Sequence, residues 1–312
     1  MSWERKPKIL LLTDVPNWAW AIKSNQIKKY LSDEFDIEIV HLLGVGSRGF
    51  NVENFDLYLV YGWSYCNRLN GVRPINRKIS GVTAHKEKDF FRRNIVPALK
   101  TTQWHHANSI LLKHELEEAG FENVFYVPNG VDEELFHEIN PIPESRSNLI
   151  VGHVGKNCGQ GTDAKGHTEF IEPSCKQAEV VYKGHYNNYK TQIPHSQMVD
   201  FYQGTDLFIV ASKTDGTPNG ALEAAACGRP ILSNKIGNMP EFIVDGHNGF
   251  LIDRDVTQYI EKLLWFKEHR EEMREMGKNA RKTIEEAWTW KVCSENYRNM
   301  FKTILNQIGL RK

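Results

Sequence analysis

The sequence predicts an α/β fold with two domains, each a parallel sheet covered by helices. Its 312 residues exceed the usual size of a single hydrophobic core and suit two domains of roughly 150 residues each. Short β-rich runs alternate with helical patterns almost throughout, which is typical of strand–helix–strand units. Between the two alternating series lies HEINPIPESRSN at 137–148, a proline-rich polar stretch that we interpret as the linker.

The first series predicts six strands. They are expected at residues 8–13, 37–43, 57–61, 78–82, 102–107 and 124–127. Its clearest helices are 22–32, which has apolar residues at helical spacing on one side, and 109–119, which Gly120 ends.

The second series predicts five strands and a helical end. The strands are expected at residues 149–154, 178–182, 207–211, 230–233 and 249–252. The chain is helical from residue 256, and its last segment, 292–308, is long enough to return to the first domain. The expected architecture is two Rossmann-like domains facing a cleft, with ligands at the carboxyl ends of the strands. We expect a first domain at 1–140 with the helix at 292–312, and a second at 141–291.

Composition excludes several classes of protein. No apolar run approaches the roughly 20 residues that span a bilayer, and MSWERKPKILLL shows no cleavage-site pattern, so we expect a cytoplasmic protein. Its five cysteines are scattered without a CxxC pair, and its histidines lie singly, so we expect no metal site. A formal net charge of zero gives the whole molecule no attraction to nucleic acid or membrane.

One segment is strongly basic. Residues 68–100 carry nine Lys or Arg against two acids, a local charge of +7. Such a run is a solvated face in one interpretation. Because Phe90, Phe91, Ile95, Val96 and Leu99 interleave with the charges, the other interpretation is a surface for an anionic acceptor or for lipid headgroups, particularly at 86–100.

GVGSRG at 44–49 matches the GxGxxG dinucleotide fingerprint in letters only. The fingerprint requires a helix after its third glycine to hold the pyrophosphate. Only residues 50–56 separate this run from the next strand, which leaves no room for that helix. We therefore expect a loop, and a nicotinamide or flavin enzyme is the weaker hypothesis.

The segment 207–241 carries the strongest chemical signal. It predicts a strand, a loop ending at Gly216, a helix, and a second strand and helix. Thr217 is a good N-cap, and Pro218 suits the first helical position, where its missing N–H costs nothing. We expect this helix to run to Cys227.

The start of that helix predicts an anion site. The amides of Asn219, Gly220 and Ala221 would point out of the N-terminus, where peptide dipoles and N–H groups favour a diphosphate. Gly220 would let the anion approach the backbone. Glu223 would face a neutral hydroxylated group such as a ribose, and Asp215 could reach the hydroxyls of a sugar. The alternative is a well-capped amphipathic helix with incidental acids.

The segment DGTPNGALEAAACGRP at 215–230 resembles the signature of retaining glycosyltransferases of family 4, enzymes of the GT-B fold whose motif is an acid, seven residues and Glu. PNGVDEELF at 128–136, the pair Lys165–Gly166 and IGNMPEFIVDGHNGFLI at 236–252 are similar to further elements of that family. The usual first acid is Glu, and Asp215 is one methylene shorter.

The resemblance implies a role for each site residue. Lys165 and the backbone of Gly216, Thr217, Pro218, Asn219, Gly220 and Ala221 would hold the donor diphosphate. Glu223 would hold the ribose and Asp215 the donor sugar, with Lys156 as a second cation in place of the family's Arg. His85 would line the cleft near the transferred sugar, although a histidine that caps a strand is the alternative.

The implied reaction is metal-independent transfer from a UDP- or GDP-type sugar to an acceptor hydroxyl, with no cofactor. The diphosphate would leave the anomeric carbon while the acceptor attacks the same face, and Lys165 with the helix N-terminus would neutralise the leaving group. The acceptor would be a glycan or lipid-linked glycan, as in polysaccharide biosynthesis. Two alternatives stay open: a nucleic-acid acceptor such as a modified phage DNA base, and a non-catalytic nucleotide-binding module or dinucleotide oxidoreductase.

Overall fold

The computed structural model describes residues 5–42, 54–70, 72, 74–144, 146–156, 163–187 and 194–310. The chain forms two compact units. Unit 1 comprises Met1–Asn129 and Trp290–Lys312, and unit 2 comprises Gly130–Thr289. The predicted loop at 44–49 lies outside the described residues.

Unit 1 is built on a six-stranded parallel sheet in the order β2-β1-β3-β4-β5-β6. The strands are β1 (Lys8–Thr13), β2 (Asp36–His41), β3 (Leu57–Val60), β4 (Lys78–Val82), β5 (Trp104–Ala107) and β6 (Val124–Tyr126). Alternate residues of β1 enter opposite cores: Ile9 and Leu11 pack on one side of the sheet, and Leu10 and Leu12 on the other. This alternation follows from the two-residue period of a strand buried on both faces.

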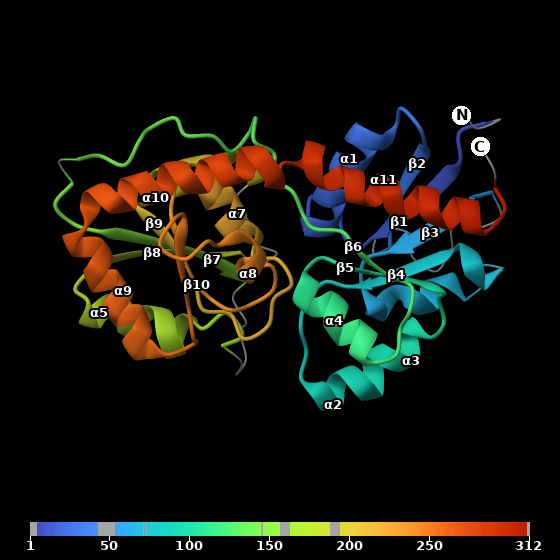
Figure 1. Ribbon diagram of the computed structural model, residues 1–312, viewed down its shortest axis with the longest axis horizontal. Coiled ribbons are helices and arrows are strands. Elements are labelled where there is room, and N and C mark those ends of the chain that lie inside the picture. The colour runs from blue at the N-terminus through green and yellow to red at the C-terminus, as the bar shows by residue number, and fades with distance from the viewer. Residues whose placement is uncertain are drawn as a thin grey trace. The chain divides into compact units, whose positions relative to one another are not determined.

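Helices cover both faces of this sheet. One face packs against α1 (Ala19–Leu31) and α11 (Trp290–Gln307), which lie side by side (Figure 1). The predicted return of the C-terminal helix to the first domain is therefore confirmed. The other face packs against η2 (Trp63–Leu69), the continuous helical stretch α2 (Lys88–Phe90), η4 (Phe91–Ile95) and α3 (Val96–Leu99), and α4 (Ile110–Glu118). A short turn, η3 (Ile75–Arg77), precedes β4.

Unit 2 is built on a five-stranded parallel sheet in the order β11-β10-β9-β7-β8. The strands are β7 (Ile150–Lys156), β8 (Val181–Asn187), β9 (Leu207–Val210), β10 (Ile231–Asn234) and β11 (Gly249–Ile252). Here too, alternate residues of β9 enter separate cores on the two faces.

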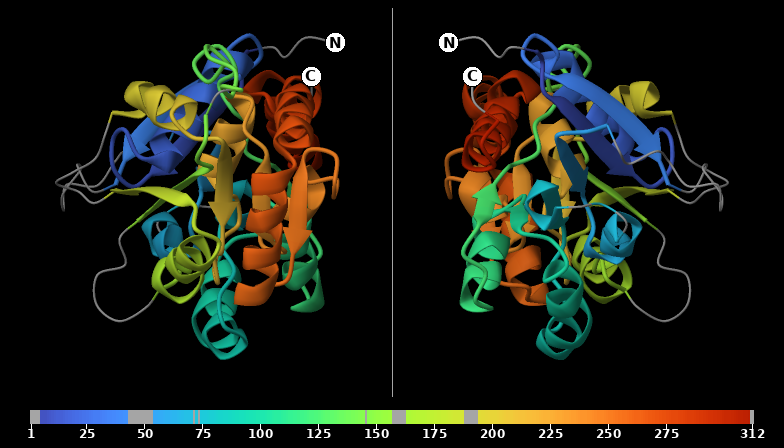
Figure 2. Two further views of the ribbon diagram at one scale, coloured as in Figure 1. Left: turned by 90° about the vertical axis from the view of Figure 1, so that its left-hand side faces the viewer. Right: turned by 90° about the vertical axis from the view of Figure 1, so that its right-hand side faces the viewer.

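The helices of unit 2 also cover both faces of its sheet (Figures 1 and 2). On one face lie α6 (Met198–Gln203), α7 (Asn219–Ala226), α8 (Met239–Phe242), α10 (Arg270–Thr283) and η7 (Ile284–Trp288). On the other face lie η5 (His167–Ile171), α5 (Glu172–Gln177) and α9 (Val256–Glu268). The turn η6 (His195–Gln197) leads into α6. These two units confirm the predicted α/β class.

One strand differs clearly from its expected position. The strand expected at 178–182 begins at Val181, because Ala178 is still the C-cap of α5 and Glu179 has φ 51°. A residue in the left-handed region interrupts extended backbone. Several other predicted ends differ by one or two residues, such as β5, which begins at Trp104.

One lysine of α1 is buried where this helix packs against α11. Lys23 is 2% exposed, and its Nζ is 5.0 Å from the ring centre of Tyr61 and 5.3 Å from that of Tyr297. Among the described residues, Nζ has no hydrogen-bond partner. Burial disfavours the ammonium form and lowers the pKa of Lys23 to about 7.

Lys23→Met should stabilise unit 1 at neutral pH. The pKa of Lys23 is about 7 in the folded chain against an ordinary value of 10.5, so the unfolded chain binds the proton more tightly. The free energy of unfolding should therefore rise with pH between these two values and fall as pH drops towards 7. The variant should lose this slope and gain roughly 2 to 5 kcal/mol at pH 7.

Urea unfolding at several pH values measures this effect. Lys28→Met, on the exposed side of the same helix, is the matched control and should keep the wild-type slope. A Lys23→Met protein with an unchanged slope would show that Lys23 does not titrate abnormally.

Candidate functional site

Two loops of unit 2 meet at the carboxyl end of its sheet. Gly166 has φ +71°, and a Cβ at this position would lie 2.2 Å from the carbonyl oxygen of Ala211. The amide of Lys213 donates to the carbonyl of Ala164 at 2.8 Å. Only glycine permits this approach, so the Lys165–Gly166 pair fixes the first loop against the end of β9.

This contact places Lys165 beside Asp215. The Lys165 ammonium donates to Asp215 Oδ2 in an ion pair, and the amide of Gly216 donates to Asp215 Oδ1 at 3.0 Å. The residue Asp215 is 9% exposed. Two residues that the sequence predicted for different parts of a ligand are thus brought together as each other's counter-ion.

The neighbouring helix start is already occupied by a carboxylate of the chain. The amides of His167, Thr168 and Glu169 donate to Asp163 at 2.8, 2.7 and 2.9 Å. These bonds satisfy the first amides of η5 and hold the pKa of Asp163 below its ordinary value despite partial burial, which acts in the opposite direction. An anionic ligand would have to displace Asp163 there.

The start of α7 differs from the prediction. Pro218 is the N-cap, with φ −67° and ψ 81°, and the first helical residue is Asn219. Thr217 as N-cap and Pro218 as first helical residue were therefore wrong, because the ψ of Pro218 is not helical. The helix ends at Ala226, with Cys227 as its C-cap. A proline has no side-chain oxygen that could cap the first amides.

Only the first turns of α7 reach the surface. Asn219, Gly220 and Glu223 are half-buried, whereas the remaining residues of the helix, and Gly216, Thr217 and Pro218 before it, are buried. Ala221 is buried, and its amide donates to the carbonyl of Pro218 at 2.9 Å, so the prediction of a free amide at Ala221 was wrong. The site predicted from 216–221 and Glu223 is therefore accessible only at Asn219, Gly220 and Glu223, and we call this partly exposed helix start the α7 opening.

Gly220 is tightly packed on the side where a side chain would stand. A Cβ at this position would lie 3.1 Å from Phe208 Cζ and 3.3 Å from the Tyr202 hydroxyl oxygen. Glycine therefore lets α7 pack closely against β9 and α6. The hydrogen that replaces the side chain faces the core.

Both oxygens of the Glu223 carboxylate have partners. Tyr202 donates its hydroxyl to Oε2 at 2.6 Å, and His195 Nε2 lies 2.9 Å from Oε1. Tyr202 is fully buried. The sequence analysis predicts neither partner: it treats the histidines only as possible metal ligands, and no pattern distinguishes Tyr202 from a core aromatic residue.

The predicted second cation, Lys156, belongs to the first strand of unit 2. Lys156 is the last residue of β7, and its side chain lies outside the described residues. His153, the other basic residue in this part of the chain, is buried, and its Nδ1 lies 2.9 Å from the carbonyl of Ile209. Burial lowers its pKa to about 4, so His153 is neutral near pH 7 and supplies no positive charge.

His85 belongs to unit 1, in the loop after β4. Its Nδ1 lies 3.0 Å from Glu115 Oε2 on α4. This contact ties the loop to α4 and orients the ring, and the other ring nitrogen, Nε2, is buried without a hydrogen-bond partner among the described residues. The structure thus brings Lys165, Asp215 and Glu223 into one unit and places His85 in the other.

The C-terminal end of α7 is held by two arginines. The fully buried Arg229 donates to the carbonyls of Cys227 at 2.7 Å and Thr205 at 2.9 Å. It donates further to the carbonyls of Tyr202, Gln203 and Asn140. Arg281 of α10 donates to the carbonyl of Ala226 at 2.8 Å. Positive charge at this end complements the helix dipole.

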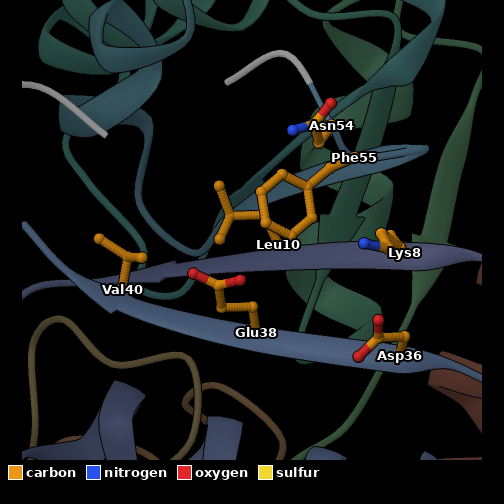
Figure 3. Close-up of a pocket in the computed structure, with 7 residues that line it drawn as sticks. All are labelled: Lys8, Leu10, Asp36, Glu38, Val40, Asn54 and Phe55. Carbon is orange, nitrogen blue, oxygen red and sulfur yellow. The ribbon is translucent and has the colours of Figure 1, made fainter. Parts of the chain in front are cut away.

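A pocket of about 250 Å³ lies elsewhere, in unit 1. Figure 3 shows its lining by residues of β1, β2 and the segment before β3. These are Lys8, Leu10, Asp36, Glu38, Val40, Asn54 and Phe55. None of them is a predicted site residue, and the two carboxylates make the pocket unsuited to a diphosphate. Nor does any group of three or more His, Cys, Asp or Glu in the described part of the chain suit a metal ion.

The segment of unit 2 that contains the candidate site matches a known family. Residues 165–283, which begin at Lys165 and include α7, match the family model described as glycosyl transferases group 1. The chain is 25% identical over 139 residues to D-inositol 3-phosphate glycosyltransferase 2 of Catenulispora acidiphila, which covers 44% of this chain and 31% of that protein. It is 26% identical over 215 residues to the capsular polysaccharide biosynthesis glycosyltransferase CapM of Staphylococcus aureus, covering 59% and 52%.

The likeness to solved structures extends over both units. HepE of Anabaena, solved in complex with UDP, superimposes with a TM-score of 0.68 at 14% identity, covering 95% of this chain and all of that one. The fold is GT-B. In sequence, the matched regions span only about a third to a half of these two curated relatives, and among the described residues no helix is both long and apolar enough to cross a membrane.

Arg229→Met should destabilise unit 2 strongly. The variant keeps a side chain of similar length but leaves several buried carbonyls without a donor, at about 1 to 3 kcal/mol each. We expect the free energy of unfolding to fall by about 3 kcal/mol or more, measured by urea denaturation. Arg274→Met, on the half-buried side of α10, should change it by less than about 0.5 kcal/mol. Equal effects of the two substitutions would contradict the anchoring role of Arg229.

Proposed function

We propose that this chain is a retaining glycosyltransferase of family 4. It transfers a sugar from a nucleotide-diphosphate sugar to a hydroxyl of a glycan or lipid-linked glycan. The observation that carries the proposal is the opening at the start of α7. No side chain caps the N-terminus of this helix, and Lys165, Asp215 and Glu223 belong to the same unit, within the segment that matches the family.

The donor diphosphate binds at the start of α7. A helix N-terminus favours a phosphate through its dipole and its first amides, and Pro218 offers no side-chain oxygen to take that place. The η5 start is a poor alternative because Asp163 occupies it. HepE, which shares the fold, has been solved with UDP, with UDP and glucose, and with UDP-glucose, which supports a uridine nucleotide as the first donor to test.

The Lys165–Asp215 ion pair suits an exchange of partners. When the donor binds, the Lys165 ammonium moves to the diphosphate, and the Asp215 carboxylate then accepts hydrogen bonds from the sugar hydroxyls. Before binding, each charge stabilises the other in a partly buried position. During transfer, Lys165 and the helix N-terminus stabilise the leaving diphosphate, whose oxygen takes the proton of the acceptor.

Glu223 keeps room for a ribose although both oxygens have a partner. A carboxylate offers about four acceptor positions, and Tyr202 and His195 use two of them. The two remaining positions can each accept a ribose hydroxyl. In unit 1, His85 stays the residue proposed from the sequence to lie near the transferred sugar, and its Nδ1 contacts Glu115 Oε2.

Two variants should affect nucleotide binding and turnover differently. Glu223→Gln should weaken nucleotide binding by about tenfold or more, because a charge-assisted bond to the ribose becomes a neutral one. Asp215→Asn should keep nucleotide affinity, since Lys165 loses its competing partner, but should lower turnover by about 100-fold or more. The measurements are calorimetric binding and mass-spectrometric detection of released nucleoside diphosphate across a panel of UDP-, GDP- and ADP-sugars.

Glu268→Gln, at an exposed position of α9, is the matched control and should behave as the wild type. Unchanged binding and turnover in Glu223→Gln would overturn the assignment of the site. Equal losses of binding and turnover in Asp215→Asn would mean that Asp215 holds the loop. Absence of nucleoside diphosphate release with every donor would favour a non-catalytic nucleotide-binding module or an oxidoreductase.

We also propose that the segment 86–100 of unit 1 rests on an anionic membrane, which would bring a lipid-linked acceptor to the enzyme. Its apolar residues do not form the expected surface: Phe91, Ile95 and Leu99 are buried in the core of unit 1. That burial turns the basic residues outwards. Lys86, Lys88, Arg92, Arg93 and Lys100 are exposed, and Phe90 is 41% exposed among them, an arrangement that suits headgroups with one apolar anchor.

Arg92→Glu with Arg93→Glu should abolish this contact. We expect the wild type to sediment with vesicles containing phosphatidylglycerol, to be released by salt, and to ignore phosphatidylcholine vesicles. The double variant should stay in the supernatant, and Lys278→Glu with Lys282→Glu on α10, which are equally charged, should not. Binding to duplex DNA in place of vesicles would favour the nucleic-acid acceptor, and binding to neither would leave the stretch a solvated surface.

A further inference from the structure

The imidazole of His195 is the second partner of Glu223 and the more accessible one. His195 Nε2 lies 2.9 Å from Glu223 Oε1, and the His195 side chain is 31% exposed against 15% for Glu223. The ring of His195 also packs edge-on against Phe136, with the ring centres 4.9 Å apart. The imidazole is thus fixed by one polar and one aromatic contact beside the opening of α7.

The groups that face His195 come from three parts of unit 2. From α7 comes the Glu223 carboxylate, and from α6 the Tyr202 hydroxyl, which binds the other oxygen of that carboxylate. From the start of unit 2, before β7, come Phe136 and Asp132, and the charge of Asp132 also favours a protonated ring. Burial alone would lower the pKa of His195, but the contact with Glu223 outweighs it and raises the pKa above its ordinary value of 6.5.

Tyr202 and His195 make different contributions to Glu223. The Tyr202 hydroxyl is neutral, and burial together with Glu223 raises its pKa well above the ordinary range, so it donates a hydrogen bond without changing the charge. His195 can donate the same bond in either state, but only the protonated ring cancels the negative charge of the carboxylate. A carboxylate whose charge is not cancelled repels a diphosphate at the neighbouring helix start.

We propose that His195 is a positioning residue for the donor: its protonated ring neutralises Glu223, so that a diphosphate can bind beside that carboxylate, and donor affinity therefore decreases as the ring loses its proton. The proposal rests on the proposed function of the α7 opening. It assigns to His195 a role through Glu223, without direct contact with the reacting atoms.

The direction of the pH dependence follows from the raised pKa. Below that pKa His195 is protonated and affinity is at its highest, and affinity falls as pH rises through the pKa. One charge next to a diphosphate in a partly hydrated site changes affinity by about threefold to tenfold. Because binding and protonation are linked, the donor should raise the pKa of His195 in turn.

The test is calorimetric titration of UDP-glucose and GDP-mannose from about pH 5.5 to about pH 8.5. Both diphosphates are esterified at each end, so the ligands do not titrate in this range. His195→Gln is the decisive variant, because its amide nitrogen can reach the position of Nε2 and donate to Glu223 but cannot carry a charge. We expect the wild type to lose about threefold to tenfold in affinity with rising pH, and His195→Gln to bind weakly at every pH without this dependence.

His247→Gln, at an exposed position of unit 2, should keep the wild-type profile. The imidazole titration of His195, followed by NMR, gives a reading without ligand: its midpoint should lie above the ordinary value and drop in Glu223→Gln. A flat wild-type profile, or a His195→Gln profile as steep as the wild type, would overturn the role of His195 even if the donor binds. Failure of every protein to bind either nucleotide sugar at any pH would instead sink the proposed function.

Discussion

The hydrogen bonds from two arginines to the carbonyls at the C-terminal end of α7 are the constraint on which the rest of unit 2 depends. Arg229 and Arg281 donate to the carbonyls of Cys227 and Ala226, and Arg229 also binds the turn between α6 and β9 and the carbonyl of Asn140. Backbone groups from distant parts of the chain thus meet one buried guanidinium. These carbonyls would otherwise be buried without a donor, so the arginines fix the C-terminal end of α7, which lies away from the candidate site. Because the helix is rigid, its N-terminus is fixed as a consequence.

At the other end of α7, charges are arranged in compensating pairs. Lys165 faces Asp215, and Glu223 faces His195 with Tyr202 behind it. Such pairs keep ionised groups stable in a partly buried site before any ligand arrives. Under the proposed function, a diphosphate would bind by exchanging partners with charges that are already in place, which needs little rearrangement of the backbone. The close packing of Gly166 on Ala211 and of Gly220 on Phe208 supplies the rigidity that this exchange requires.

The alternating strand and helix patterns were enough to predict the fold class, the order of the strands along the chain and the return of α11 to unit 1. Buried parallel strands and amphipathic helices are local patterns, which sequence records directly. Ends of elements were less predictable. Thr217 and Pro218 fit the general preferences for a helix start, yet the helix begins at Asn219 because the loop before it is drawn against Gly237, whose added Cβ would lie 2.5 Å from the carbonyl oxygen of Gly216. That approach involves residues about 20 positions apart, and no local propensity contains it.

The sequence by itself determined which residue types stand near the start of α7: a lysine before a glycine, an acid, a helix start and a second acid eight positions later. Their order along the chain, together with the family resemblance, is enough to suggest a diphosphate and a sugar. Only the tertiary structure decided how they pair. Lys165 and Asp215 are 50 residues apart, and His195 and Glu223 are 28 apart, so their contacts exist only because parallel strands bring successive loops to one edge of the sheet. The same packing explains why Tyr202, which has no signature in the sequence, became a partner of the central carboxylate.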